Sequence, residues 1–515
     1  MTTINQALIC NNFTGIKKVQ SSFSSSSISA SDMQNVELFD TGINSGVGIR
    51  TMLGNTSVFE FEDENIINIF KSVQQSEEYF FIHTEDNSEG KIYLYNPLSN
   101  TVTLKVDGLD VTGVSCGTDF AQGWDDLFIF SNGVNILSIQ IGHYDEHSNL
   151  DEVTSMSLLG TEGETVAGLG LIVFDGRLWI YNQNRLFYSV KENCYDFETS
   201  NVGITTSAGY IEFVKNITAI TPYLGALAIF HSDSSEMLSV NSDYSYSVSK
   251  ESPGGCFGPD SLTFHGAQLY FYDDIKKSVF AFSQIVNGET TLIDNIANDV
   301  QDEFFDISSS DKYKLKMFSV IQSDRNEIWL VLPPKDGYSE ILIFDCVHSC
   351  WVKRKSQRIS SLLCFKDEFY SSSGNKLLIE YTGDSFDGEF VDAFYSCAPL
   401  NLGVDNSLKV LYIPPRVTLD MEHTNEFFVQ YIRDYNALNK IKRKFIKSDS
   451  LKNLFVWDVS FWDSIFRFKP KNSNSIKRLP TEHFKTLQIT FETEDLNQGF
   501  AIKNIEFSNI KVKQV

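Results

Sequence analysis

A short apolar pattern recurs along residues 70–382, at steps of roughly 40 to 60 residues, and it constrains the fold more than any other feature. Each copy consists of an aromatic and aliphatic strand, a polar turn and a second apolar strand. This spacing matches the length of one four-stranded blade of a β-propeller. The first strands of the copies are residues 79–82, 127–130, 178–181, 227–230, 269–272, 328–331 and, more weakly, 368–370.

The turns inside this pattern indicate antiparallel hairpins. Asp175 and Gly176 separate two apolar runs, and Asp-Gly in such a place is a strong hairpin signal. His265 and Gly266 separate two further runs in the same way. The strands are continuously apolar rather than alternating, so both of their faces must be covered, and sheets stacked around an axis provide that cover. The sequence therefore predicts an all-β fold with a six- or seven-bladed propeller over residues 61–390; an irregular array of β-sandwiches is the alternative.

The two ends of the chain lack this rhythm. Residues 1–60 include a run of serines at 21–31, which predicts an extended N-terminal arm or linker. Residues 391–515 contain longer strand patterns, which predict a separate C-terminal β-sandwich-like domain. One short helix is expected near residues 299–305. The longer C-terminal strands are expected at residues 409–413, 427–433, 486–492 and 502–507.

The charge of the chain is large and unevenly distributed. With 42 Lys and Arg against 67 Asp and Glu, the formal net charge is −25. Residues 1–400 carry 24 basic and 54 acidic residues, a balance of −30, and residues 401–515 carry 18 and 13, a balance of +5. Binding to phosphates requires clustered Lys and Arg, so duplex DNA is not expected to bind the whole surface. The asymmetry instead predicts two regions with different neighbours.

The compartment is inferred from the cysteines and from the absence of targeting segments. The eight cysteines are scattered through a large chain, which predicts free thiols buried in a protein made in a reducing compartment. No secretory signal is visible at the N-terminus. No stretch approaches the 18 consecutive apolar residues that would indicate a membrane span.

Two passages combine Cys or His at short spacing. Cys346, His348 and Cys350 would share one face of a strand, but zinc requires a fourth ligand and a second cysteine pair that is absent. His143 and His147 have a spacing that suits a metal on a helix, whereas their surroundings predict a loop. We expect neither passage to hold a metal, and we expect no Cys/His nucleophile because no third orienting group is indicated.

Two acidic turns offer oxygen atoms to a calcium ion. Residues 86–90 (DNSEG) lack the later acidic ligand of a calcium loop, and residues 384–388 (DSFDG) are composed of ordinary turn residues. Propellers also include sialidases, but the repeated Ser-x-Asp-x-Gly-x-Thr-Trp turn of that class is missing. The sequence therefore predicts no catalytic, cofactor-binding or metal-binding residue, and we expect the protein not to be an enzyme.

A basic run near the C-terminus is the one passage with the composition of a nucleic-acid contact. It contains Lys440, Lys442, Arg443, Lys444 and Lys447, with aromatic residues nearby. Such a run is most often a solvated face. We favour docking of these residues onto an acidic neighbouring subunit over contact with DNA.

Four passages spread along the chain carry a resemblance to a known family. In chain order they are residues 31–38 with 48–51, residues 261–282, residues 324–330 with 341–345 and 349–351, and residues 457–458 with 462–463 and 477–480. Together they resemble the tail nozzle and packaged-DNA-stabilisation proteins of short-tailed bacteriophages. The first passage is similar to the family's opening, the next two to its blades, and the last to its C-terminal β-domain.

The resemblance implies a virion protein of the phage tail, made in the host cytoplasm. It implies identical copies assembled as a ring, a homohexamer, below the portal-adaptor ring. Such a ring retains the packaged DNA, contacts the genomic DNA transiently during ejection, and carries tail fibre or spike proteins. It brings no cofactor and no catalytic motif. An acidic channel wall would repel the DNA phosphates, although a merely solvated acidic surface explains the charge equally well.

Two other classes of propeller protein remain as alternatives to the tail subunit. A propeller protein of a virion or cell surface that binds or cleaves carbohydrate would be a monomer with a deep axial pocket lined by carboxylates and aromatic rings. An intracellular propeller scaffold would carry Gly-His and Trp-Asp repeats, and these are absent from residues 61–390. The oligomeric state separates the tail subunit from both.

Overall fold

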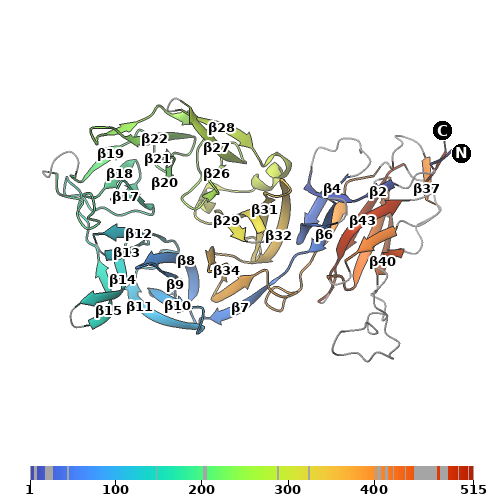
Figure 1. Cartoon of the computed structure of the whole chain (residues 1–515), viewed down its shortest axis with the longest axis horizontal. Coiled ribbons are helices and arrows are strands. Elements are labelled where there is room, and N and C mark those ends of the chain that lie inside the picture. Colours follow the sequence, from blue (N-terminus) through green and yellow to red (C-terminus); the bar gives the residue numbers. More distant parts are fainter. Residues whose placement is uncertain are drawn as a thin grey trace. The chain divides into compact units, whose positions relative to one another are not determined.

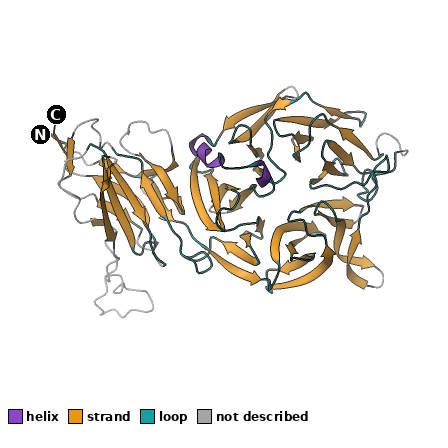
Figure 2. Ribbon diagram, turned by 180° about the vertical axis from the view of Figure 1, so that it is seen from behind, coloured by secondary structure: helices purple, strands orange, loops and turns teal. Residues whose placement is uncertain are grey.

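The computed structural model consists almost entirely of β-strands (Figure 2). Two short 3-10 helices, η1 (Asn298–Phe304) and η2 (Ser309–Asp311), are the helical segments among the described residues, and η1 lies where a short helix was expected. No helix in that part of the chain is long and apolar enough to cross a bilayer. The structure describes residues 2–4, 8–17, 27–42, 46–123, 125–145, 148–200, 206–286, 289–322, 325–400, 402, 408–411, 416–420, 423–434, 436–445, 473–475, 485–496, 498–507 and 510–513.

Seven antiparallel sheets, counted over these residues, follow one another around an axis and form a seven-bladed β-propeller (Figure 1). From the inner strand outward they are β8 (Asn65–Gln74), β9 (Glu77–Glu85), β10 (Gly90–Asn96) and β11 (Thr101–Leu109); β12 (Cys116–Gln122), β13 (Asp125–Ser131), β14 (Ile136–Asp145) and β15 (Ser148–Ser155); β16 (Leu171–Phe174), β17 (Arg177–Asn182), β18 (Arg185–Tyr188) and β19 (Gly209–Glu212); β20 (Ala219–Tyr223), β21 (Ala226–Phe230), β22 (Ser234–Val240) and β23 (Tyr246–Val248), with β24 (Ser252–Pro253) beside β22; β25 (Leu262–His265), β26 (Gln268–Asp273), β27 (Ser278–Val286) and β28 (Glu289–Asn295); β29 (Lys316–Gln322), β30 (Arg325–Val331), β31 (Tyr338–Asp345) and β32 (Cys350–Gln357); and β33 (Ser361–Phe365), β34 (Glu368–Ser373), β35 (Lys376–Glu380) and β7 (Asn55–Glu60).

The predicted hairpins are present in these sheets. Asp175 and Gly176 both adopt positive φ, 51° and 67°, in the two-residue turn between β16 and β17. Positive φ at both positions defines the turn type whose twist matches that of paired strands. The strands that follow are buried on both faces: all five residues of β21 are buried, as are the first five of β17. The prediction of an all-β propeller is thus confirmed, with seven blades.

Aromatic rings fill the space between successive blades. Phe81 of β9 stacks on Phe128 of β13 with ring centroids 4.8 Å apart, and Trp329 of β30 meets Phe369 of β34 edge to face at 5.0 Å. Trp329 is fully buried. Such pairs contribute beyond the area that they bury, so the high aromatic content of the chain stabilises the blade interfaces.

The ring closes through a strand from the N-terminal side of the chain. The seventh sheet has the order β33-β34-β35-β7, so its outer strand precedes the first blade in sequence. The following segment is held to the same sheet, because Asn375 Nδ2 donates to the Phe61 carbonyl at 2.6 Å and Ile66 N donates to the Gly374 carbonyl at 2.7 Å. Sequence periodicity predicted the blades but not this closure.

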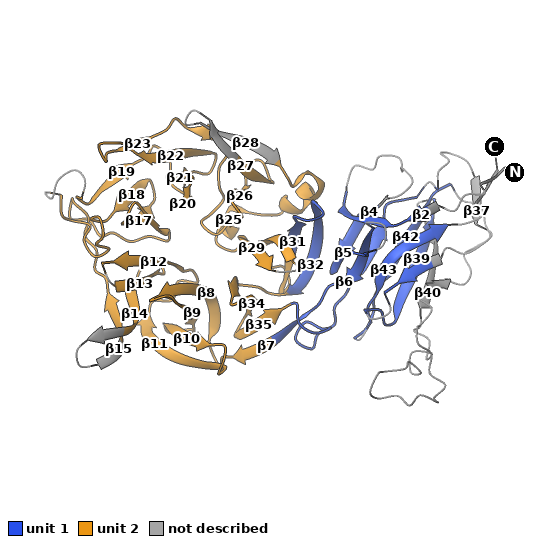
Figure 3. Ribbon diagram, viewed as in Figure 1, with its two compact units in different colours: residues 1–56, 341–356, 381–515 blue, residues 57–340, 357–380 orange. Residues whose placement is uncertain are grey.

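The chain divides into two compact units (Figure 3). Unit 2, residues 57–340 and 357–380, holds most of the propeller. Unit 1 comprises residues 1–56, 341–356 and 381–515, and it therefore includes most of β31 and β32 of the sixth blade. Unit 1 contains a 12-stranded sheet and a three-stranded sheet. The larger sheet consists of β2 (Leu8–Cys10), β3 (Asn12–Ile16), β4 (Ser27–Gln34), β5 (Val36–Asp40), β6 (Val47–Thr51), β36 (Phe394–Cys397), β38 (Arg416–Leu419), β39 (Phe427–Arg433), β40 (Asn436–Phe445), β41 (Ser473–Ser475), β42 (Leu487–Glu492) and β43 (Ala501–Phe507), and the smaller of β1 (Thr2–Ile4), β44 (Ile510–Lys513) and β37 (Leu408–Leu411).

Unit 1 differs from the domain boundaries that the sequence suggested. Residues 1–60 were expected to form an arm, but their described part contributes β1 to β7. Within β4, Ile28 and Ala30 are completely buried, and they share one face of the strand because they alternate with serines. Strands β3 and β4 are parallel, and β4 pairs with β36, in which Ser396 is opposite Asp32. The C-terminal strands expected at 427–433, 486–492 and 502–507 are present as β39, β42 and β43.

Candidate functional site

Residues from five blades meet at a small cavity near the propeller axis. The cavity has a volume of about 20 Å³. Since each of these blades contributes residues at or before its innermost strand, the cavity can only lie close to the axis. Such a volume holds about one water molecule. An ion pair between Asp260 and Lys316 (3.6 Å) and the half-exposed ring of Tyr313 are its most polar and aromatic parts. The lining residues are Ile67, Gly113, Val114, Ser115, Cys116, Leu169, Pro259, Asp260, Tyr313 and Lys316.

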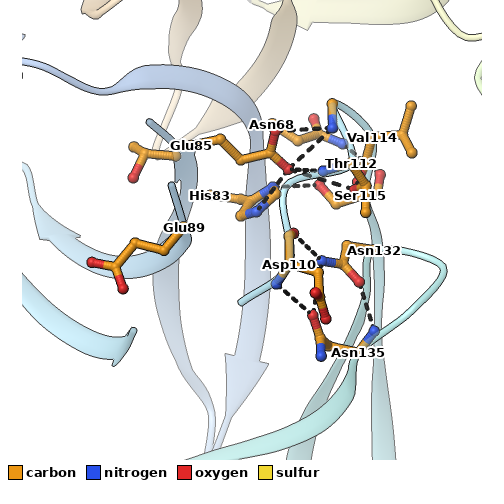
Figure 4. A network of polar contacts seen from close by, with 12 residues as sticks. Asn68, His83, Glu85, Glu89, Asp110, Thr112, Val114, Ser115, Asn132 and Asn135 are labelled. Carbon is orange, nitrogen blue, oxygen red and sulfur yellow. Dashed lines mark hydrogen bonds and ion pairs between the residues drawn. The ribbon is translucent and has the colours of Figure 1, made fainter. Parts of the chain in front are cut away.

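A buried polar network holds one wall of this cavity (Figure 4). Glu85, at the end of β9, accepts hydrogen bonds from the backbone N–H groups of Thr112 (2.9 Å) and Gly113 (2.9 Å). His83 Nδ1 is hydrogen-bonded to Ser115 Oγ at 3.0 Å, and Asn68 Nδ2 donates to the Ser115 carbonyl at 3.0 Å. The network thus fixes the segment that leads from the outer strand of the first blade to the inner strand of the second.

Asparagines of the second blade hold the start of the same segment. Asn132 Nδ2 donates to the Asp110 carbonyl at 2.8 Å, and Asp110 N donates to Asn135 Oδ1, also at 2.8 Å (Figure 4). Asn132 Oδ1 in turn accepts from the backbone N–H of Asn135 at 2.7 Å. Buried amide groups satisfied in this way define a single loop conformation.

The electrostatics of this network favour positioning over proton transfer. Burial lowers the pKa of His83 to about 3, so its ring is neutral at pH 7. His83 Nε2 has no hydrogen-bond partner within the described residues, and Glu85 Oε1 lies 3.8 Å away. A general base needs a pKa near the working pH. Sequence reasoning missed this network, because His83, Glu85 and Ser115 have no motif spacing.

A larger cavity lies within unit 1. Its volume is about 280 Å³, close to the lower limit of ordinary small-ligand pockets. The end of β6 with the residues after it, the turn at Asp384, the loop before β39 and the residues just before β43 form its walls. The lining includes Arg50, Met52, Asp384, His423, Asn425 and Gln498. No sequence pattern singled out this set, since its members come from four separate segments.

The predicted basic contact lies at one end of the large sheet of unit 1. Lys440, Lys442, Arg443 and Lys444 belong to β40, which pairs with β39; Lys447 lies outside the described residues. Strand β40 is the first strand in the order of that sheet. The passages at 457–458, 462–463 and 477–480 also lie outside the described residues.

The first calcium candidate is occupied by a lysine. Lys91 Nζ lies 2.8 Å from Glu64, 3.3 Å from Glu89 and 3.8 Å from Asp86. Asp86 Oδ1 also accepts from Ser88 Oγ (2.7 Å), Ser88 N (2.6 Å) and Glu89 N (2.9 Å), and these hydrogen bonds lower the pKa of Asp86 to about 2. An ammonium therefore supplies the positive charge that the three carboxylates require.

The second calcium candidate is a turn packed on a buried arginine. Asp387 N donates to the Asn55 carbonyl at 2.9 Å. The guanidinium of Arg354 lies over the rings of Phe386 (4.8 Å) and Tyr381 (5.3 Å), and it donates to the Leu53 carbonyl at 3.1 Å. These contacts give Phe386 and Asp387 a structural role in the turn.

The Cys/His passage also has structural partners. His348 Nδ1 lies 2.6 Å from Asp345 Oδ2, and His348 Nε2 lies 3.6 Å from Asp40. The hydrogen bond with Asp345, followed by the charges of Asp345 and Asp40, raises the pKa of His348 despite its partial burial. Burial raises the pKa of Cys350 to about 12, so this thiol stays protonated. All eight cysteines are free, as predicted, and five of them are buried.

The surroundings of His143 differ from the loop that the sequence predicted. Strands β14 and β15 form a hairpin in which His143 is opposite Leu150. The alternation of apolar and polar residues runs from Leu137 to Ile141 and stops at Gly142, so the continuation of the strand was not recognised from the sequence. His147 lies outside the described residues.

Comparison with known proteins finds no matching family model and no matching curated protein. Solved structures do match. A catalytically inactive virginiamycin B lyase from Staphylococcus aureus, solved with quinupristin, is 13% identical with a TM-score of 0.41, covering 64% of this chain and 98% of the lyase. A streptogramin B lyase structure is 12% identical with a TM-score of 0.39, covering 67% and 96%.

These neighbours contradict one prediction from the sequence. We expected the protein not to be an enzyme, but both similar structures are lyases built as propellers. A propeller without a recognised catalytic motif can still be an enzyme, so we withdraw the prediction that this protein is not one. Identities of 12 and 13% bring no lyase activity to this chain either.

Proposed function

We propose that this chain is a subunit of the tail of a short-tailed bacteriophage, in which identical copies form a ring that retains the packaged DNA and conducts it during ejection. The observation that carries the proposal is the division of charge between the units. Unit 2, which holds most of the propeller, has 18 Lys and Arg against 46 Asp and Glu, a balance of −28. Unit 1 has 24 against 21, a balance of +3.

This division suits a conduit. A protein that surrounds moving DNA must not hold it, and a strongly acidic surface repels phosphates over about a Debye length, roughly 8 Å at physiological salt. A near-neutral unit can bury surface against other subunits without that repulsion. The resemblance to tail nozzle proteins runs through both units, since the passage at 31–38 falls in β4 and β5 and the passage at 261–282 in β25 to β27.

The proposal is tested by location and by oligomeric state. Mass spectrometry of purified virions, with immunogold labelling, should find the chain at the tail. Light scattering after size exclusion should find a multimer, and negative-stain micrographs should show rings. A monomer that is absent from purified virions would overturn the proposal.

The basic run near the C-terminus provides a second test. Replacing Lys440, Lys442, Arg443, Lys444 and Lys447 with serine should abolish ring assembly if these residues dock onto an acidic neighbouring subunit. If they contact DNA instead, rings should assemble normally and the particles should lose packaged DNA. Serine replacement of Lys250, Lys276, Lys314, Lys335 and Lys366, all in unit 2, removes the same charge and is the matched control.

A second candidate function is that of a propeller-bearing surface protein that binds or cleaves glycans. The cavity of about 280 Å³ in unit 1 favours it, because polar side chains line the cavity together with the apolar Met52 and Leu53. The axial cavity of about 20 Å³ is too small for a sugar ring. A glycan array probed with the purified protein tests this candidate independently of the virion.

A further inference from the structure

The cavity of unit 1 has rigid walls. Thr51 N donates to the Phe500 carbonyl at 2.9 Å, and Phe500 N donates to Thr51 Oγ1 at 3.1 Å, which ties the end of β6 to the start of β43. Asn425 N donates to the Gly499 carbonyl at 2.9 Å, and Gly499 N donates to the Glu426 carbonyl at 3.1 Å. The backbone around the cavity is therefore formed before any ligand arrives, which lowers the entropic cost of binding.

The arginine of the cavity is held in place from behind. Arg50 and Glu37 are cross-strand neighbours on β6 and β5, and Arg50 Nε donates to Glu37 Oε1 at 2.5 Å. The guanidinium also lies over the ring of Phe39, 5.6 Å from its centroid. A guanidinium has five N–H donors, and four of them are on the two Nη atoms. Arg50 itself lines the cavity, so it presents a positioned donor group to a ligand there.

The cavity offers hydrogen-bond donors and acceptors together with apolar surface. Asn425 and His423 are exposed, and no side-chain hydrogen bond of theirs is found in the described part of the chain. Gln498 Oε1 accepts from Glu494 N at 2.7 Å, which leaves its amide as a donor. Asp384 contributes a carboxylate, and the buried Met52 contributes apolar surface.

The charges on the walls favour a neutral ligand over an anion. The positive charge of Arg50 is already neutralised by Glu37, and Asp384 adds a negative charge that would repel a carboxylate or phosphate. A hydroxyl both donates and accepts hydrogen bonds. A ring of hydroxyls with an apolar C–H face therefore satisfies the donors, the carboxylate and Met52 together.

We infer that this cavity binds one neutral pyranose ring of a glycan, through Arg50, Asp384, Asn425 and Gln498, with Glu37 and Phe39 positioning Arg50. The inference rests on the second candidate function and deepens it, and it is independent of where the protein is located. A cavity of this size accommodates a single ring rather than a long chain of sugars. A glycan would then be recognised through a terminal residue.

The test titrates the full-length protein with neutral methyl pyranosides of glucose, galactose, mannose and N-acetylglucosamine, followed by saturation-transfer NMR and calorimetry. Glucuronate serves as the charged counterpart, and cyclohexanol as a ring that lacks the hydroxyl pattern. We expect at least one neutral glycoside to bind with a millimolar dissociation constant, with contacts from its C–H face. Glucuronate should bind at least about ten-fold more weakly.

Variants of exposed wall residues locate the binding without disturbing the core. Asp384→Asn should weaken binding by about ten-fold or more because a neutral amide oxygen accepts a hydroxyl more weakly than a carboxylate does. Asn425→Ala should have a similar effect because it removes the amide that bonds the ligand. A Cβ at Gly499 would stand 3.8 Å from Thr51 Oγ1 and 4.0 Å from the His423 carbonyl, which places it inside the cavity without a clash. Gly499→Ala should therefore fold normally, and Gly499→Leu should fill the cavity and abolish binding. Asp243→Asn, at an exposed turn of the propeller, is the matched control.

Three results would overturn the inference. They are no binding of any neutral glycoside at tens of millimolar, preferential binding of glucuronate, or binding that persists unchanged in Gly499→Leu and Asp384→Asn. If glycosides bind and the binding is unchanged in Gly499→Leu and Asp384→Asn, the second candidate function stands, but the binding site lies elsewhere in the protein. Localisation at the virion tail is unaffected by all three.

Discussion

The propeller unit and unit 1 use the same element, the antiparallel strand, but their strands pair over very different distances along the chain. In the propeller, β8 and β9 pair across a turn at Gln75 and Ser76, and the next strands follow in order. In unit 1, the Tyr395 hydroxyl donates to the carbonyls of Thr14 and Ile28, 381 and 367 residues away. Pairing between strands that are adjacent in the sequence can be predicted from local patterns, whereas pairing between strands far apart in the sequence cannot.

The same difference predicts different folding behaviour. Closing a long loop costs entropy before distant contacts form, so topologies rich in such contacts fold slowly. Each of the first six blades of the propeller can form from its own segment, whereas the seventh blade needs β7 and unit 1 must wait for both ends of the chain. The predictions below probe this contrast, in order of decreasing effect.

Removal of a blade-interface ring should have the largest effect. Trp329 is fully buried, its Nε1 donates to Glu327 Oε2 at 2.8 Å, and its ring meets Phe369 of the next blade. Trp329→Ala should lower the free energy of unfolding by about 3 to 5 kcal/mol. Urea denaturation followed by circular dichroism measures the loss. Tyr244→Ala, at a ring that is 55% exposed, should change stability by less than about 0.5 kcal/mol; equal losses for the two would contradict the assigned core.

Acid should destabilise the propeller through His83. The pKa of this buried imidazole is about 3, against about 6.5 in the unfolded chain. Between these values the unfolded chain binds a proton that the folded protein excludes, so stability falls as the pH drops below 6.5, by about 2 kcal/mol at pH 5. His83→Gln should reduce this dependence in urea titrations at pH 7 and pH 5. An unchanged slope would show that His83 is protonated in the folded state.

His348 should give unit 1 the opposite pH dependence. Its hydrogen bond with Asp345 raises its pKa, so the folded protein holds the proton more tightly than the unfolded chain. This contribution is fully present below pH 6.5 and is lost as the pH rises through the folded value. His348→Gln should remove the loss above neutral pH, and NMR titration of the His348 ring gives its pKa directly. A pKa at or below 6.5 would contradict the prediction.

Two buried tyrosine hydroxyls compare the units more finely. Tyr181 donates to the Thr218 carbonyl at 2.8 Å within the propeller, and Tyr395 donates to carbonyls of β3 and β4 within unit 1. Tyr181→Phe and Tyr395→Phe should each cost about 1 kcal/mol. In stopped-flow experiments the Tyr395 change should mainly speed unfolding, because the distant contacts form late. Equal effects of Tyr395→Phe and Tyr181→Phe on the folding rate would remove the kinetic contrast between the units.

The lysine at the first calcium candidate should matter least. Lys91 is partly exposed in its cluster with Glu64, Asp86 and Glu89, and screening keeps ion pairs at the surface weak. Lys91→Met should change thermal stability by about 0.5 kcal/mol. Calcium should not stabilise the natural protein, and it should stabilise Lys91→Met if the ammonium replaces a cation. Stabilisation of the natural protein by calcium would reverse our interpretation of Lys91.

Particular residues show which features of the structure could be predicted from the sequence. The Asp175-Gly176 turn and the apolar runs at 178–181 and 227–230 predicted blades, because a hairpin is specified by its own residues and by burial of both strand faces. The role of Ile28 was missed because serines surround it, and no local rule states that such a segment pairs with β36. The network of His83, Glu85 and Ser115 was missed for a similar reason, since its members are not at motif spacing.

The sequence by itself determined the strand-rich fold, the recurring blade, the free thiols and the concentration of acidic residues ahead of the C-terminal region. These depend on composition and on contacts between neighbouring segments. Only the tertiary structure decided that β7 closes the seventh blade, that the N-terminal residues complete unit 1, and that Arg50, Asp384 and Asn425 line one cavity. Those outcomes depend on which distant strands pair. Backbone hydrogen bonds are the same for every possible partner strand, so the packing of side chains in three dimensions determines which pairing forms.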